Sequence, residues 1–494
     1  MKNNKIYNVI FLVFIIIFLT YSLFDINEPL SNAHPGFITG QYSEYAINYL
    51  KLGYLKTKLA QLWNTGSLET GKEKYEVYVH RPIGTSLLIS FGFLIFGYHE
   101  WAARLVQVLF NLGTLIFIFL ITKELWNKKT AVYALFFLVF SPMFFYMRNL
   151  ISPDAIAIFF ILSTIYFYVK WIKYKKKNFF YYLILIFIAG TIVDWSVNFV
   201  VPVIILHYFL FYRKNNNRKI LLLVPLAILM FSLNIFHIFL VSGNWGLSDL
   251  YKIMLFRLNL SEESKGYGIT LIGLMQHFYR DFNYFYTPVL FFLFILFLLS
   301  FIKNIGKVMW KESLIILTFL SMLGYLFIFS NIYWIHDFLI LFVLPTIPIS
   351  GAIMVEKLEN IKLFKGSLKP ISYILIVILL ITFLIYSYNS IIKIYRGNSE
   401  VSDIVGFLSK NKKDLIISFW EHPQNFQLKF YLEGKKVYYA RDIETFKEII
   451  NKNENVGLFI EKESDPLDQE FKNYLVNNFP SLKFKEYTVF FLKK

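Results

Sequence analysis

The sequence predicts a polytopic α-helical membrane protein with a small α/β domain at its C-terminal end. Of the 494 residues, 56% are hydrophobic and only 17% are charged, whereas about a quarter of the residues in soluble domains are charged. Apolar runs of about 17–22 residues recur through residues 1–395, and a helix of that length crosses roughly 30 Å of hydrocarbon. Residues 396–494 return to the composition of a soluble domain.

The charge and the cysteine count narrow the function classes. The net charge of +17 comes largely from Lys residues in short loops between apolar runs, where they set topology and meet anionic lipid. We therefore do not expect nucleic acid as a partner. The chain has no Cys, which excludes disulfides and thiolate zinc sites. The first apolar run follows Lys2 and Lys5 without a small-residue cleavage site, so we expect an uncleaved span.

Basic loops orient the predicted helices. The positive-inside rule places the N-terminus and five basic loops in the cytoplasm. Two long connections, 25–81 and 242–285, have nearly balanced charge and are expected outside. The five basic loops are residues 123–129, 170–177, 213–219, 303–311 and 357–369.

With the basic loops inside and the two long connections outside, the chain must cross the membrane eleven times. The C-terminal domain is then extracytoplasmic. Residues 82–97 are apolar but too short to span easily, and a crossing there would invert every later loop. We expect this segment to lie in the outer interface or to be re-entrant, with a twelfth span as the alternative. The expected spans are 6–24, 102–123, 130–147, 153–172, 179–194, 196–212, 219–241, 286–303, 312–330, 338–354 and 370–389.

The last hundred residues show the patterns of a mixed domain. Short runs rich in β-branched and aromatic residues predict strands, and amphipathic runs predict helices. A small α/β domain is the expected result. The predicted strands are 414–419, 456–460 and 487–492, and the predicted helices are 443–451 and 469–478.

The topology was inferred from the Lys and Arg residues of the inner loops. It places a different set of residues, with reactive side chains, together on the outer side of the membrane. Acidic groups close to hydrocarbon cost about 2.5–3.5 kcal/mol each on insertion scales, so they usually have a use. Their common side favours an active site. The set consists of His34, Glu44, His80, Arg81, Arg148, Asp154, Asp194, Trp195, His336 and Asp337.

Each acidic candidate also has a structural explanation. Asp154 follows Ser-Pro and could cap a helix, and Asp194 could be a turn residue between two short spans. His336 and Asp337 could form an interfacial cap, and Glu44 could lie on a solvated helix face.

The residue types suit transfer to or from a phosphate. A carboxylate can take a proton from a hydroxyl group, and Arg can neutralise a phosphate by bidentate hydrogen bonds. Arg81 is the first candidate for the phosphate contact and Arg148 the second, with an ion pair to Asp154 as the alternative for Arg148. His and Asp could ligate a divalent metal, but no HExxH-type spacing supports one. The chain has no Walker A loop or dinucleotide fingerprint, which argues against ATP-driven or nicotinamide chemistry.

Several segments together resemble the GT-C glycosyltransferases, in the branch of protein O-mannosyltransferases and aminoarabinose transferases. The resemblance covers roughly residues 5–355, and the order and spacing of the segments carry it. The segments are HPGFITGQYSEYAINYLKLGYLKTK, VHRPIGTSLL, FGYHEWAARL, SPMFFYMRNLISPDAIAIFF, GTIVDWSVNF and IHDFLILFVLPTIPISG.

The resemblance implies an enzyme that moves a sugar from polyprenyl phosphate, with inversion, to a protein, lipid or glycan acceptor outside the membrane. It implies an acidic base early in the first outer loop, but residues 37–40 carry no acid. Glu44 follows one helical turn later, and Asp25 and Glu28 lie upstream. Arg81 stands where the family has a phosphate-contacting Lys.

The leading hypothesis assigns roles accordingly. Glu44 or Asp154 would be the base or would orient the acceptor, while the other candidates would hold the phosphate or line the cavity. The connection 242–285 would shape the acceptor groove. The phosphate-binding set is His80, Arg81 and Arg148, and the cavity-lining set is His34, Asp194, Trp195, His336 and Asp337.

Two other functions stay open. A lipid or glycan transporter would need polar residues inside its spans, and these are few: Asn111, Asn234 and His237. A non-catalytic glycan-assembly partner would explain the missing acid in the first loop.

Overall fold

A computed structural model gives the arrangement of the chain. It describes residues 2–28, 30, 34–64, 75–212, 218–304, 307, 309–360, 369–398, 415–418, 436–440, 442–452, 457–462, 467–484 and 487–492.

The chain divides into two compact units, each of which is built from separate stretches of sequence. The first unit comprises Met1–Ile26, Val79–Thr85 and Leu105–Tyr395. The second comprises Asn27–Tyr78, Ser86–Arg104 and Arg396–Lys494.

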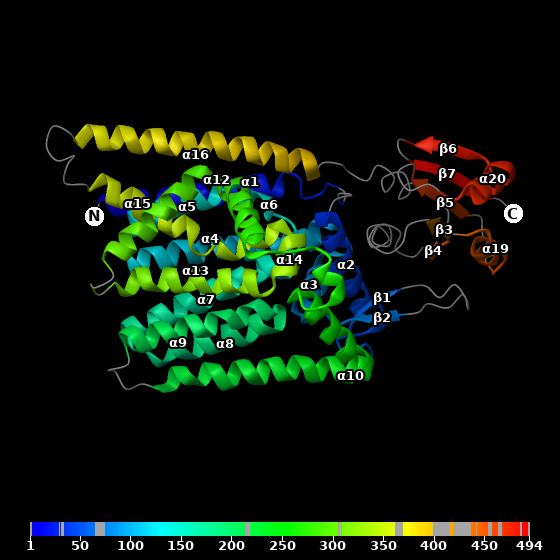
Figure 1. Cartoon of the computed structure of the whole chain (residues 1–494), viewed down its shortest axis with the longest axis horizontal. Coiled ribbons are helices and arrows are strands. Elements are labelled where there is room, and N and C mark those ends of the chain that lie inside the picture. The colour runs from blue at the N-terminus through cyan, green and yellow to red at the C-terminus, as the bar shows by residue number, and fades with distance from the viewer. Residues whose placement is uncertain are drawn as a thin grey trace. The chain divides into compact units, whose positions relative to one another are not determined.

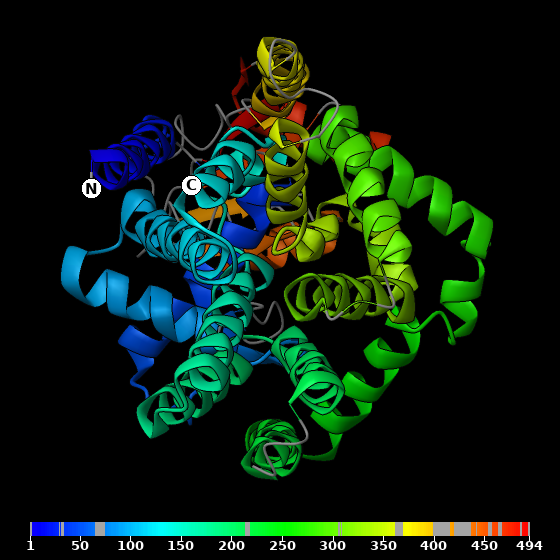
Figure 2. The ribbon, with the colours of Figure 1, turned by 90° about the vertical axis from the view of Figure 1, so that its left-hand side faces the viewer.

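Long apolar helices lie side by side in the first unit (Figure 1), and Figure 2 shows them end-on. Among the described residues, seven helices are long and apolar enough to cross a membrane, and the bent pair η4 and α15 raises the number to eight. The seven are α1 (Lys2–Leu23), α4 (Glu100–Leu125), α7 (Pro153–Tyr174), α10 (Leu223–Arg257), α12 (Leu271–Lys303), α13 (Trp310–Ile328) and α16 (Lys369–Asn398).

Helices occupy all eleven positions expected for spans, but three are shorter than a full span. The expected span 130–147 is divided between two helices, because Ser141 caps the second one and Pro142 begins it. Asp194 ends one short helix and caps the next. The short and bent helices are α5 (Lys128–Val139), α6 (Pro142–Tyr146), α8 (Lys177–Val193), η1 (Trp195–Phe199), α9 (Val200–Phe211), η4 (Asp337–Val343) and α15 (Ile347–Glu359), and short elements η3 (Arg218–Leu222), α11 (Glu262–Lys265) and α14 (Ser330–Ile335) join them.

Two long helices extend into the connection expected over residues 242–285. α10 continues beyond its expected end to Arg257, and α12 begins at Leu271, so most of that connection is helical. Each helix breaks close to the boundary expected from hydropathy. Gly243 has φ 64° and ψ −153°, a region open essentially only to Gly. Thr287 departs from helical geometry directly before Pro288, which disfavours a helical residue in front of it.

The N-terminal part of the second unit combines a helix with a hairpin that the sequence analysis did not predict. Strands β1 (Gln61–Asn64) and β2 (Tyr75–Tyr78) are antiparallel, and α2 (His34–Leu52) packs against β1. The Asn48 side chain donates a hydrogen bond of 2.8 Å to the carbonyl oxygen of Leu62.

The apolar segment 82–97 forms α3 (Gly84–Phe96), a helix of 13 residues. At 1.5 Å per residue it reaches about 20 Å, which is less than the roughly 30 Å needed to span a membrane. α3 is therefore shorter than a full span, and its place at the membrane interface stays a prediction.

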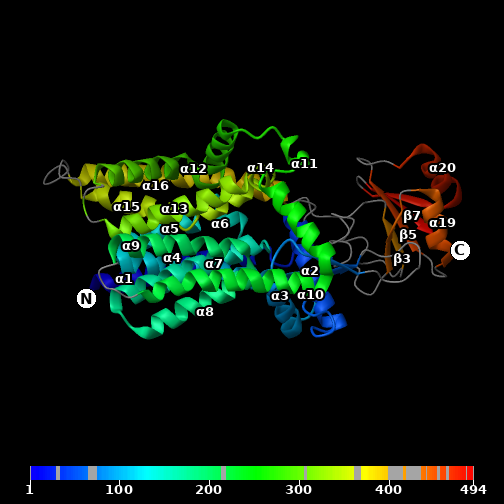
Figure 3. The same cartoon turned by 60° about the horizontal axis from the view of Figure 1, so that its bottom comes forward.

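The C-terminal part of the second unit is a five-stranded mixed sheet with the strand order β4-β3-β5-β7-β6. Helices α19 (Ile443–Lys452) and α20 (Gln469–Asn478) cover the same face of this sheet (Figure 3). Phe446 of α19 and Phe471 of α20 share one core with Phe459 of β5. The elements expected from sequence are present, while β4 and β6 were not predicted. The elements are β3 (Leu415–Ser418), β4 (Lys436–Tyr439), α19 (Ile443–Lys452), β5 (Gly457–Lys462), α20 (Gln469–Asn478), β6 (Ser481–Phe484) and β7 (Tyr487–Leu492).

Candidate functional site

Arg81 lies between two carboxylates that are distant in sequence. Its Nη1 atom donates to Asp154 Oδ1 at 2.9 Å and also to Asp194 Oδ2. Its Nη2 atom is 3.4 Å from Asp154 Oδ2. The Arg81 side chain is 10% exposed, while those of Asp154 and Asp194 are 5% and 0% exposed. Three of the predicted site residues therefore form one buried ionic cluster.

Local structure explains how the two carboxylates reach Arg81. Asp194 adopts an extended conformation between α8 and η1, and its Oδ1 accepts a hydrogen bond of 2.8 Å from the Ser196 amide. Asp154 lies in the first turn of α7, but Ser152 holds the N-cap position. The explanation of Asp154 as the capping residue is therefore wrong, and its carboxylate is directed to Arg81 instead.

Close packing of Gly84 positions the segment that carries Arg81. A Cβ atom on Gly84 would lie 2.7 Å from the Ile192 carbonyl oxygen and 2.8 Å from Val193 Cα. Such distances are not tolerated, so only Gly lets the start of α3 approach the end of α8. The same contact brings Arg81 to Asp194, the residue that follows Val193.

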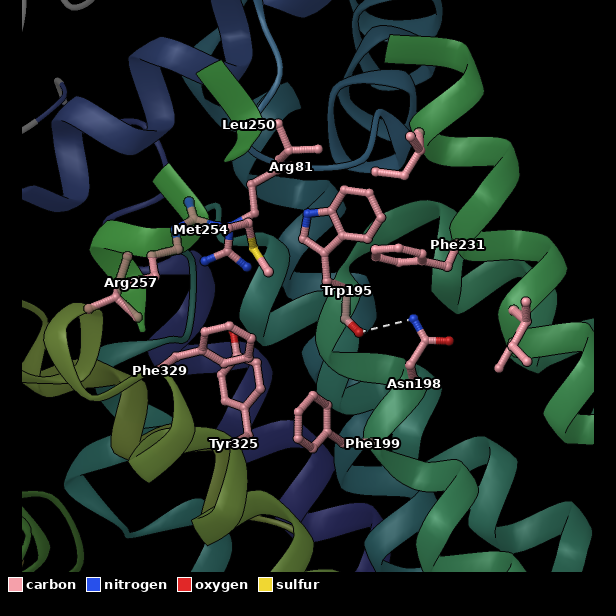
Figure 4. A pocket seen from close by; sticks show the side chains of 14 residues that line it. Arg81, Trp195, Asn198, Phe199, Phe231, Leu250, Met254, Arg257, Tyr325 and Phe329 are labelled. Atoms are coloured by element: carbon pink, nitrogen blue, oxygen red, sulfur yellow. Dashed lines mark hydrogen bonds between the residues drawn. The ribbon is translucent and has the colours of Figure 1, made fainter. Parts of the chain in front are cut away.

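A cavity of about 350 Å³ adjoins Arg81, and its size is within the range of small-molecule sites. Two guanidinium groups, of Arg81 and Arg257, supply its positive charge, and Trp195 and Asn198 supply further polar groups (Figure 4). Most of the remaining lining is apolar or aromatic. These side chains are Phe199, Ala227, Ile228, Phe231, Ile235, Leu250, Met254, Tyr325, Phe329 and Ile332.

His80 connects several of these elements. Its Nε2 atom is 2.8 Å from Asp249 Oδ2. Its backbone carbonyl accepts hydrogen bonds from Trp195 Nε1 at 3.2 Å and from Arg257 Nη1 at 3.3 Å. Burial and the nearby Arg257 lower the pKa of the His80 imidazole below its usual value, with Asp249 opposing the shift. This shift favours the neutral form of the His80 imidazole.

Arg148 takes part in a different ion pair. Its Nη2 atom donates to Asp25 Oδ2, and its guanidinium lies 4.1 Å from the centre of the Phe145 ring. Asn149 Nδ2 donates to the other Asp25 oxygen at 2.8 Å. The alternative partner suggested by the sequence, Asp154, is thus wrong, and Arg148 lies outside the cavity lining.

His336 lies between α14 and η4, and Asp337 begins η4 beside a second polar cluster. In that cluster Asp281 Oδ2 is 3.0 Å from His277 Nε2 and accepts a hydrogen bond of 3.2 Å from the Tyr333 hydroxyl. The cluster joins α12 to α14. His277 and Asp281 are four positions apart, and this i, i+4 spacing would have revealed the pair once the segment was treated as a helix.

The remaining two candidates, His34 and Glu44, belong to the second unit. Glu44 is buried on α2, with 6% exposure, which contradicts the expectation of a solvated helix face. Beside it, burial raises the pKa of the Tyr45 hydroxyl well above its usual value. His34 begins α2, and its side chain lies outside the described residues.

Sequence reasoning missed Asp249 and Arg257, because it assigned their segment to a balanced outer connection. On α10 they lie eight positions apart, with Leu250 and Met254 between them on the cavity side. Among the described residues, no group of three or more His, Asp or Glu side chains is placed to hold a metal ion.

Comparisons with known proteins identify the fold. The sequence profile of the family described as dolichyl-phosphate-mannose-protein mannosyltransferase matches residues 80–237. This stretch contains Arg81, Asp154 and Asp194. An uncharacterized protein of Aquifex aeolicus is 27% identical over 147 residues, which are 29% of this chain and 26% of that protein. YkcB of Bacillus subtilis, a candidate mannosyltransferase, is 28% identical over 100 residues, which are 20% of this chain and 14% of that protein. The matches thus span well under half of either relative.

Solved structures match almost the whole chain. ArnT from Cupriavidus metallidurans, in the apo state, has a TM-score of 0.59 and 11% identity, with 99% of this chain and 98% of ArnT covered. The same protein bound to undecaprenyl phosphate has a TM-score of 0.60 and 10% identity, with 97% of each chain covered. The Archaeoglobus fulgidus oligosaccharyltransferase has a TM-score of 0.55 and 11% identity, with 93% of this chain and 70% of that chain covered. The fold is that of the GT-C membrane glycosyltransferases, as the sequence resemblance predicted.

Proposed function

We propose that the protein is an inverting glycosyltransferase that moves a sugar from a polyprenyl-phosphate donor to an acceptor. The cavity lined by Arg81, Arg257 and apolar or aromatic side chains carries this proposal. A polyprenyl-phosphate sugar combines a long apolar chain with an anionic head group, and each part has a matching surface in the cavity. Arg is the residue best suited to a phosphate, because its planar fork donates two parallel hydrogen bonds.

The reaction is a single displacement at the anomeric carbon of the sugar. The acceptor hydroxyl oxygen attacks from the face opposite the phosphate and forms the new bond to that carbon. The bond between the carbon and the phosphate oxygen breaks, and the phosphate leaves with the electron pair. Arg81 and Arg257 stabilise the negative charge that develops on it, and a carboxylate accepts the hydroxyl proton.

The two buried carboxylates beside Arg81 orient that guanidinium. Asp154 and Asp194 both accept hydrogen bonds from Arg81 Nη1, so Asp154 suits orientation better than proton abstraction. Glu44 is the candidate for the base, because it follows closely on the stretch in which the sequence resemblance implies an acid. A Glu44→Gln variant that folds and binds donor but transfers no sugar would support this role.

Lipid phosphates bound to proteins of this fold support the choice of donor. ArnT has been solved with undecaprenyl phosphate, and the archaeal oligosaccharyltransferase AglB has been solved with an inhibitory peptide and a dolichol-phosphate. Both proteins share the fold at low sequence identity, so their ligands guide the experiment on this chain.

The topology belongs to the same proposal. The basic loops favour a cytoplasmic N-terminus and an extracytoplasmic reaction. Residues 1–395 would form the catalytic membrane part, and residues 396–494 would form an extracytoplasmic domain. The acceptor would be a protein, a lipid or a glycan of the cell envelope.

The test uses the purified full-length protein with radiolabelled polyprenyl-phosphate sugars and cell-envelope acceptors. We expect label to enter an acceptor while free polyprenyl phosphate forms, and we expect both to fall in the Arg81→Lys variant. Lys252→Ala, a change at an exposed residue of α10, serves as the matched control. Movement of the lipid across vesicles without any transfer would establish a transporter and overturn the proposal.

A further inference from the structure

The cavity is lined by both halves of one broken helix. Residues 223–242 of α10 contribute Ile228 and Phe231, while the second half, residues 244–257, contributes Met254 and Arg257. The break at Gly243 leaves the second half without a continuous helical connection to the first. Other contacts must therefore determine where Arg257 lies.

The segment that precedes Arg81 provides those contacts. The His80 ring pairs with Asp249, and the His80 carbonyl accepts a hydrogen bond from Arg257 Nη1. Close packing supports both contacts, because a Cβ atom added to Gly246 would lie 3.3 Å from Val79 Cγ1. One residue thus holds the half-helix at two points, which lie about 12 Å apart along its axis at 1.5 Å per residue.

We propose that His80 and Asp249 are positioning residues that hold Arg257 beside Arg81, so that both guanidinium groups meet one phosphate. The inference rests on the proposed function, because it assumes an anionic lipid in the cavity. It assigns His80 to positioning, whereas the sequence suggested direct phosphate binding. Neither His80 nor Asp249 lines the cavity, which agrees with an indirect role.

The physical reason is the cost of ordering a long side chain. An unrestrained Arg loses rotamer freedom when it binds a phosphate. An Arg257 already held by the His80 carbonyl has lost much of that freedom beforehand. The His80 imidazole can donate an Nε2 proton to the Asp249 carboxylate, and this hydrogen bond sets the rotation of the half-helix.

The experiment measures binding of undecaprenyl phosphate and of uncharged undecaprenol to the full-length protein in nanodiscs. We expect Asp249→Ala to weaken undecaprenyl phosphate binding about tenfold, the effect of losing one hydrogen bond to a charged group. Undecaprenol binding should not change. His80→Gln, whose amide can still donate to Asp249, should bind more tightly than His80→Ala, and Lys252→Ala should bind like the unaltered protein.

A double-mutant cycle separates positioning from a general structural role. If Asp249 acts through Arg257, then Asp249→Ala should cause no further loss in an Arg257→Ala background. Additive losses, or equal weakening of phosphate and alcohol binding, would overturn the positioning role.

The outcomes also distinguish the two proposals. An unaltered protein that binds no undecaprenyl phosphate would remove the proposed function together with this inference. Binding that depends on Arg81 and Arg257 but is unaffected by Asp249→Ala and His80→Ala would leave the function standing and remove only the positioning role.

Discussion

Arg148 and Arg81 look alike in the sequence but have different surroundings in the fold. Both are nearly buried and both pair with Asp. Arg148 is held between Asp25 and the Phe145 ring, away from the cavity lining. Arg81 is shared by Asp154 and Asp194 and still lines a cavity.

The difference shows that a buried arginine is a ligand candidate only when a cavity reaches its guanidinium. The partners of Arg148 are protein groups, namely the Asp25 carboxylate and the Phe145 ring, and this ion pair joins the segments that follow α1 and α6. At Arg81 the carboxylates orient the guanidinium, while the neighbouring Arg257 adds a second positive charge to the same cavity. The comparison therefore predicts loss of transfer at Arg81 and loss of stability at Arg148.

The largest effect is expected for Arg81→Lys. Lys keeps the positive charge between Asp154 and Asp194 but lacks the planar fork that binds phosphate. Loss of one donor to a developing oxyanion typically costs about 10²–10³-fold in rate, so we expect kcat/KM for transfer to fall by about that amount. Steady-state kinetics with a labelled lipid donor measure this, with thermal unfolding as the folding control. A normal kcat/KM would exclude Arg81 from the phosphate site.

Arg148→Ala should instead affect stability. It leaves the nearly buried Asp25 carboxylate without its cation, and breaking such a pair costs about 3–5 kcal/mol. We expect a lower unfolding temperature and an unchanged KM for the lipid donor. The Arg148→Ala, Asp25→Ala double variant should recover part of the loss, because no unpaired charge remains. A raised donor KM in folded Arg148→Ala would make the two arginines equivalent.

Gly243→Ala should weaken lipid-phosphate binding through the break in α10. A backbone with φ 64° and ψ −153° costs a residue other than Gly about 1–3 kcal/mol, so the break is expected to relax and move Arg257. We expect affinity for undecaprenyl phosphate to fall by about 5- to 150-fold, the equivalent of that free energy. Gly324→Ala is a suitable control, because open space surrounds that position.

The smallest effect is a pH dependence that arises from His80. The folded pKa of His80 lies below the ordinary value of about 6.5, so the unfolded chain binds the proton more readily. Its contribution to stability is complete above pH 6.5 and is lost as the pH falls toward the folded pKa. The unfolding temperature should therefore decrease between pH 7 and pH 5 by more in the unaltered protein than in His80→Gln. Identical pH profiles would contradict this assignment.

Local patterns in the sequence predicted the helices and much of the candidate site. The expected span ends at 241 and 286 lie within two positions of the breaks at Gly243 and Thr287. Arg81, Asp154 and Asp194 were predicted to belong to one outer-facing site, and the Arg81 side chain does contact both carboxylates. The hairpin β1–β2 was missed because its pairing was not marked by a short turn between clearly alternating strands.

Apolar length and the distribution of Lys and Arg are properties of short stretches, so the sequence by itself determined the membrane class and most helix positions. Only the tertiary structure decided which carboxylate pairs with which arginine, because the partners of Arg148 and Arg81 lie 123 and 113 positions away. It also brought Asp249 and Arg257 to His80, since that contact depends on the direction α10 takes after Gly243. Long-range packing, which no local pattern encodes, thus selected Arg81 and Arg257 as the pair that faces the cavity.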